Sequence, residues 1–132
     1  MQLRLIRKDN GETITLPADL RWIDEHDWHA IAQAAPQRTL SGSLIIQQAQ
    51  KRGGRAITLS ADYVWVSRET VQKLRDWTDT PELTLRYTHY DGREFDVLFA
   101  LHDTPLKAEP VRFAAPETAD DAYTVTLKLM TV

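Results

Sequence analysis

Cysteine is absent from this sequence of 132 residues. Its absence excludes thiol catalysis, zinc sites built on thiolates and a disulfide scaffold. Long apolar runs are missing too, since no stretch approaches the roughly 18 apolar residues of a membrane-spanning helix. The N-terminal residues also lack the apolar core that a signal peptide needs. We therefore expect a protein that is made in the cytoplasm and does not insert into a membrane.

The chain also has no excess of basic over acidic residues. The formal net charge is −3 and the sequence pI is about 5.8, whereas a protein that mainly grips nucleic acid usually carries a basic stripe. What the chain does contain is 42% apolar residues, enough to bury a core without help from a metal or disulfide. Its length is typical of one domain, so we expect a single domain over residues 1–132.

The first sixteen residues predict a β-hairpin. Two β-prone runs flank Asn10-Gly11, the strongest short-range signal for a type I′ turn, in which both central residues need positive φ. A two-residue turn would pair Leu5 with Leu16 and Arg7 with Ile14. Residues 17–30 show no clear period and predict an irregular loop.

The middle of the chain predicts further strands and one helix. Residues 31–50 indicate two strands or one bent strand, with Leu44-Ile45-Ile46 as the most buried part, followed by a turn over Lys51–Arg55. A short strand is expected at Ala56–Leu59. The helix is expected over residues 67–79, with Ser67 as its N-cap and Pro81 preventing its continuation.

The helix also has a clear apolar face. Val71, Leu74 and Trp77 recur at helical spacing, and we expect Trp65 and Trp77 to pack the helix onto a sheet. From residue 83 onward the pattern is β. Alternating apolar residues flank a second hairpin signal at Asp91-Gly92.

The last strands complete the predicted architecture. A proline-bracketed strand around Lys107–Phe113 is expected at a sheet edge, because a central strand could not spare the missing N–H groups. A final strand alternates apolar residues to the C-terminus. The fold class we predict is mainly β with one α-helix, a β-sandwich or squashed barrel with the helix packed on a sheet.

One cluster of side chains invites a catalytic interpretation. The loop holds His26, His29, Asp24 and Asp27, which could supply nitrogen and oxygen ligands to a divalent metal. The alternative, which the composition favours, is a solvated loop that its tryptophans attach to the core. No nucleophile elbow or phosphate-binding loop is present. We expect neither a catalytic site nor a cofactor.

Other residues suggest contacts with a partner. Trp22 and Trp28 lie in the irregular loop and fit either the core or a binding surface, because tryptophan is enriched at interface hot spots. A polar, glutamine-rich segment and a small basic cluster follow. The candidate interface residues are Trp22, Trp28, Gln33, Gln37, Gln47, Gln48, Lys51, Arg52 and Arg55.

The order of several segments resembles a known family. These segments are Thr39–Leu44, Gly54–Leu59, Trp65–Val71 with Leu74, and Tyr90–Phe95 with Val97 and Phe99. From about Trp22 to the end, the chain resembles the distal tail protein and related small tail-tip, or baseplate, proteins of siphophages and Mu-like prophages.

The resemblance implies a tail-tube-like fold, a β-sandwich or barrel of two packed sheets flanked by a helix, that assembles as a ring, usually a hexamer. Such a ring joins the tail tube protein to the hub and tip proteins that carry the receptor-binding apparatus, and it leaves a central channel for DNA. It places the chain in the virion, at the tail tip, assembled in the host cytoplasm and neighbouring a tape measure protein. We also expect the glutamine-rich segment Gln33–Gln50 to line the channel.

Several alternatives remain open at this point. A tail-tube, tail-completion or trimeric hub subunit would use the same fold. We expect no galectin-like C-terminal domain in a chain of this length, and therefore no direct carbohydrate binding. From other classes, a small metal-dependent enzyme or a host protein-binding module would also be compatible with the sequence.

Overall fold

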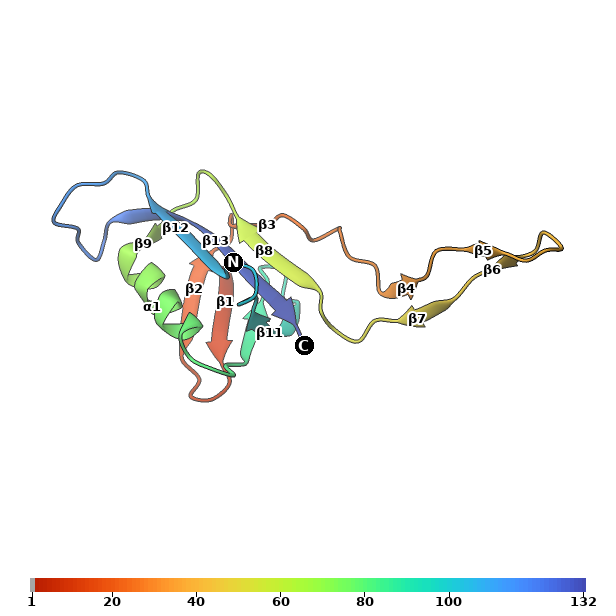
Figure 1. The fold of residues 1–132 in the computed structure, drawn as a ribbon. Helices are drawn as coiled ribbons and strands as arrows, with labels where there is room; N and C mark the ends of the chain where they lie inside the picture. The colour runs from red at the N-terminus through yellow and green to blue at the C-terminus, as the bar shows by residue number, and fades with distance from the viewer. Residues whose placement is uncertain (1) are drawn as a thin grey trace.

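The protein consists of a β-rich body with one helix and a long two-stranded arm that extends from it (Figure 1). The computed structural model describes residues 2–132, so that Met1, the first residue of the predicted N-terminal hairpin, lies outside the described residues. The predicted fold class, mainly β with one helix, is confirmed.

Within residues 2–132, nine strands form one antiparallel sheet in the body. These strands are β1 (Gln2–Arg7), β2 (Thr13–Pro17), β3 (Arg21–Trp22), β8 (Ala56–Ser60), β9 (Val66–Ser67), β10 (Leu85–Thr88), β11 (Glu94–Phe99), β12 (Leu106–Pro110) and β13 (Ala122–Thr131). Their main order is β2-β1-β10-β11-β13-β8-β3, and β9 and β12 also pair with β13. The long strand β13 therefore joins the two halves of the sheet, which are β2-β1-β10-β11 on one side and β8-β3 on the other.

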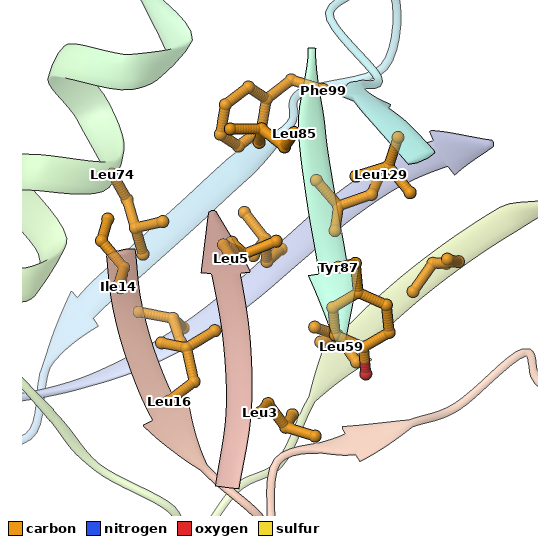
Figure 2. Close-up of a cluster of buried hydrophobic side chains, with 14 of the residues drawn as sticks. Leu3, Leu5, Ile14, Leu16, Leu59, Leu74, Leu85, Tyr87, Phe99 and Leu129 are labelled. Carbon is orange, nitrogen blue, oxygen red and sulfur yellow. The ribbon is translucent and has the colours of Figure 1, made fainter. Parts of the chain in front are cut away.

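The core lies between these two halves of the sheet. Strands with period-2 alternation direct every second side chain inward, as Leu3 and Leu5 do on β1 and Leu127 and Leu129 do on β13. These residues belong to a single apolar cluster (Figure 2). Burying each such side chain stabilises the fold by roughly 1.5–3 kcal/mol.

The helix α1 spans Arg68–Thr78, in agreement with the prediction. The Ser67 hydroxyl accepts from the Thr70 N–H at 3.3 Å as the N-cap. Val71, Leu74 and Trp77 are buried, and Figure 2 shows Leu74 beside Ile14 of β2. Trp65 was predicted wrongly, because its side chain is 56% exposed. No helix in residues 2–132 combines the length and apolar character needed to cross a membrane.

The first hairpin is present, but its predicted register is wrong. Leu5 pairs with Ile14 and not with Leu16. The reason lies in the turn, which extends over residues 7–12 and is closed by the Arg7 N–H donating to the Glu12 carbonyl at 2.8 Å. Only Gly11 in this turn has a positive φ, of 78°, so the turn is not the two-residue type I′ form. The longer loop shifts the pairing by two residues.

The later hairpin and the edge strand follow the sequence prediction. Strands β10 and β11 pair around a turn in which Gly92 has a φ of 95°. Strand β12 pairs with β13 alone, as expected for an edge strand, but it ends at Pro110 and does not reach Phe113. The irregular loop predicted over residues 17–30 contains one short strand, β3, which pairs with β8.

The arm is the largest departure from the sequence prediction. It contains β4 (Ile31–Gln33) paired with β7 (Gln48–Gln50), and β5 (Gln37–Arg38) paired with β6 (Leu44–Ile45). The residues predicted to be most buried, Leu44, Ile45 and Ile46, are instead 47%, 44% and 53% exposed. They lie on the arm, away from the body (Figure 1).

Candidate functional site

The arm is exposed over its whole length. No residue from 24 to 56 is buried, although this segment holds several large apolar side chains. Exposed ones on the arm are Ile31, Leu40, Leu44, Ile45 and Ile46. An isolated two-stranded hairpin is at best marginally stable in water, and a contiguous exposed apolar patch usually marks an interaction surface. The arm is therefore the strongest candidate for a binding element.

A break divides the arm into two ladders. In the inner ladder Gln33 pairs with Gln48, and in the outer ladder Gln37 pairs with Ile45. Three residues, Ala34-Ala35-Pro36, thus lie opposite two residues on the returning strand. Pro36 has no N–H to donate, and an extra residue on one strand bends a hairpin in the manner of a β-bulge. The break therefore lets the outer ladder take a different direction from the inner ladder.

The tip of the arm is closed by local hydrogen bonds. The Thr39 N–H donates to the Ser43 carbonyl at 2.8 Å, and the Ser43 N–H donates to the Thr39 hydroxyl at 3.1 Å. The guanidinium of Arg38 donates to the Gly42 carbonyl at 3.1 Å. Between them Leu40 is fully exposed. The tip therefore presents an apolar side chain next to a cation on an ordered turn.

The root of the arm is built around Trp22, which is only 4% exposed. Its ring packs edge-on against Tyr87, His89 and Phe95, with centroid distances of 6.4, 5.5 and 5.6 Å. The Arg55 guanidinium lies 4.4 Å from the centre of the same ring, a favourable cation–π contact. Trp22 precedes the arm and Arg55 ends it, so this contact joins both strands of the arm to the body.

Ion pairs and hydrogen bonds complete the root. Arg93 binds both Glu25 and Asp91, and it lies 5.4 Å from the Trp22 ring. The Asp24 carboxylate accepts from the N–H and the hydroxyl of Thr58 at 2.9 and 2.8 Å. The direction in which the arm leaves the body is thus fixed by several independent contacts.

The electrostatics of the root follow from these contacts. The hydrogen bond from Arg93 lowers the pKa of Glu25, because a nearby cation favours the ionised carboxylate. Burial lowers the pKa of His89, whose Nδ1 lies 2.6 Å from the Tyr87 hydroxyl. Burial also raises the pKa of Tyr87. Both shifts favour the uncharged forms of the His89 imidazole and the Tyr87 phenol.

An open cavity of about 720 Å³ lies beside the root, lined in part by Trp22, Glu25, His26 and His89. Two buried side-chain polar atoms in residues 2–132 have no hydrogen-bond partner, Trp22 Nε1 and Arg55 Nε, and both belong to the root. The cavity holds carboxylates and imidazoles, yet the His89 imidazole is engaged by its packing against Trp22 and Tyr87. Trp22 and His89 therefore belong both to the cavity lining and to the root.

The weak metal candidates are not brought together. The Asp24 carboxylate is taken by Thr58, and the His26 side chain is 93% exposed. Asp27 and His29 lie exposed at the start of the arm. Across residues 2–132, no three His, Cys, Asp or Glu side chains gather closely enough to hold a metal ion.

The predicted interface residues fall into two groups. Trp22 and Arg55 belong to the root. The sequence left open whether Trp22 lies in the core or on a binding surface, and the structure places it in the core. Trp28 is half-buried under the Lys51 ammonium, 4.5 Å from its ring centre. The side chains of Gln33 and Gln48 bond to each other across the inner ladder. Gln37, Gln47, Lys51 and Arg52 are exposed on the arm.

The residues that sequence reasoning missed are those of the body half of the root. His89, Arg93 and Phe95 come from the β10–β11 hairpin, and no local pattern connects them to Trp22. The sequence does carry one signal for the arm, because residues 28–55 contain no aspartate or glutamate.

Comparison of this chain with family models, curated proteins and solved structures finds no match.

Proposed function

We propose that the protein is a structural subunit of the tail tip of a long-tailed phage. In this role it would form a distal tail ring that links the tail tube to the hub and receptor-binding apparatus and leaves a channel for DNA. The observation that carries the proposal is the arm, a long exposed hairpin on a compact body (Figure 1). The resemblance of the sequence to distal tail proteins gives the arm its context.

The energetics of the arm favour an assembled state. Leu40, Leu44, Ile45 and Ile46 are all exposed, and burying each would contribute roughly 1.5–3 kcal/mol before the costs of association. In a monomer these side chains and the open strand edges would be an aggregation liability. In a closed ring, a neighbouring subunit covers them.

The rigidity of the root supports the same role. A ring of defined size needs each subunit to present its contact at a fixed angle, and the contacts of Trp22, Arg55 and Arg93 fix the arm to the body. A non-enzymatic role agrees with this design, because the buried groups at the root pack against one another. The partners we propose are identical subunits, the tail tube protein, hub and tip proteins and the tape measure protein.

The inner part of the arm is our candidate for the channel lining. Strands β4 and β7 carry Gln33, Gln48 and Gln50, and an uncharged polar surface would let DNA pass without adhering. A structure of the assembled ring that places these strands on its outer surface would refute this assignment.

Electron microscopy and light scattering of the purified full-length chain test the proposal. We expect closed rings, and we expect a variant in which a short Gly-Ser linker replaces residues 28–53 to remain monomeric. Single sixfold rings would support the distal tail role. Stacked rings would indicate a tube subunit, and a threefold collar a hub subunit. A full-length chain that stays monomeric at all concentrations and is absent from purified virions would refute the proposal and favour a host binding module.

A further inference from the structure

A groove lies at the end of the body opposite the arm. It has a volume of about 540 Å³ and is lined by residues before β9 and in the loop between β12 and β13, among them Trp65, Val111, Asp120 and Asp121. In Figure 1 this loop lies at the left of the molecule and the tip of the arm at the far right. The arm of one molecule therefore cannot reach the groove of the same molecule.

Exposed apolar side chains concentrate at these two ends. Trp65 and Val111, which line the groove, are 56% and 42% exposed, and Phe113, next in sequence to the lining residue Arg112, is 66% exposed. On the arm the corresponding residues are Ile31, Leu40, Leu44, Ile45 and Ile46. Large aromatic side chains in a groove are the typical anchors of an interface.

The arm and the rest of the chain carry formal charges of opposite sign. Residues 28–55 contain Arg38, Lys51, Arg52 and Arg55 and no acidic residue, so the rest of the chain holds 12 basic residues against 19 acidic ones, a formal charge of −7. In the groove, the Asp121 carboxylate is occupied by the N–H and hydroxyl of Thr118 at 3.0 Å each. Asp120 is exposed and is not among the ion pairs of residues 2–132, so it is free to meet a cation from outside. Arg112 is the one basic residue of the lining.

We infer that the arm of one copy docks in the groove of the next. The apolar side chains of Leu40 and Leu44–Ile46 would pack against Trp65 and Phe113, and Arg38 would lie against Asp120. Because the two surfaces are different and lie at opposite ends, the contact is head-to-tail, which is the kind of interface that generates rings when its rotation closes. The inference rests on the proposed function and names the subunit contact within it.

A charge-reversal pair tests this arrangement. Arg38→Glu spoils only the arm, and Asp120→Lys spoils only the groove, so each variant alone should self-associate about tenfold more weakly or worse. An equal mixture of the two should recover assembly, because the unchanged arm of one variant meets the unchanged groove of the other. The next contact then brings the two substituted side chains together, and their charges are again opposite. The recovered assemblies should contain even numbers of subunits. A matched control is Arg86→Glu, a body residue on β10, which should leave assembly unchanged.

Cysteine cross-linking tests the contact directly, since the chain has no cysteine of its own. Leu40→Cys mixed with Phe113→Cys should give disulfide-linked dimers under oxidation, and the double variant should give a ladder of linked subunits. Neither single variant alone should form them. Linked Leu40→Cys dimers would show an arm-to-arm contact and overturn the inference.

The outcomes separate this inference from the proposed function. Rings that form without the Leu40–Phe113 link would overturn the docking site and leave the ring subunit standing. Head-to-tail ladders without closed rings would support the docking site and refute the ring. Failure of the charge-reversal mixture to assemble, with both variants folded by circular dichroism, would also overturn the docking site.

Discussion

Replacing residues 28–53 by a short Gly-Ser linker should remove the arm and leave the body as stable as before. The replaced segment contains no buried residue. The root contacts survive the change, since Asp24 still meets Thr58 and Arg55 still donates to the Glu25 carbonyl at 2.8 Å. The perturbation therefore separates the stability of the body from the presence of the arm.

The expected change in the free energy of unfolding is small and positive. The loop between the paired residues Trp22 and Leu59 shortens from roughly 36 to roughly 14 residues, which lowers the entropic cost of closing it by about 1 kcal/mol. The lost hydrogen bonds of the arm are exposed, so their net contribution to the monomer is near zero. The melting temperature should stay the same or rise by up to about 4 °C.

Urea denaturation followed by tryptophan fluorescence measures this change, with the full chain as the reference. A loss of more than about 2 kcal/mol would show that the arm packs on the body and would refute the reasoning. Continued ring formation by the shortened variant would refute the role of the arm in assembly. A scrambled arm of equal length and composition is the control for chain length.

Substitutions at Trp22, Ser67 and His89 test the root and the helix, with Thr78→Ala as a control. Trp22→Ala should cost roughly 3–5 kcal/mol of unfolding free energy, and a loss below about 1.5 kcal/mol would contradict a buried root. Ser67→Ala should cost about 1 kcal/mol through the lost N-cap, whereas Thr78→Ala at the other end should cost less. Burial lowers the pKa of His89 from its usual 6.5, so the unfolded chain binds the proton first and stability should fall as the pH drops below about 6.5. The lowered pKa of Glu25 predicts a second loss below about 4.5. In thermal melts at a series of pH values, His89→Gln should abolish the loss of stability below about pH 6.5 and retain the loss below about pH 4.5.

Local signals in the sequence were enough to predict most of the body. The cap at Ser67, the spacing of Val71, Leu74 and Trp77, and the turn at Gly92 each depend on residues close in sequence, and such patterns carry to the structure. The register of the first hairpin failed because turn length is a local choice among several, and Asn10-Gly11 is compatible with more than one of them.

The arm could not be predicted for a different reason. A run such as Leu44–Ile46 has the same pattern whether a core or a neighbouring molecule covers it, because burial within one chain is a tertiary property. The same limit explains the opposite outcomes of Trp65, just before the helix, and Trp77, in its last turn, which are 56% and 2% exposed. The root was hidden because Trp22 meets His89 and Phe95 across a wide sequence separation.

Under the proposed head-to-tail docking, the way β13 joins the sheet would also determine when the molecule can begin to assemble. This strand pairs with β8, β9, β11 and β12, so the sheet requires contacts between distant segments, and such topologies fold in milliseconds to seconds. The apolar side chains of Leu44–Ile46 are accessible throughout that time, because the native arm also leaves them exposed. If the neighbour's groove next to β13 receives the arm, docking must wait for slow sheet formation. We therefore expect newly made chains to divide between assembly and aggregation according to how fast β13 pairs.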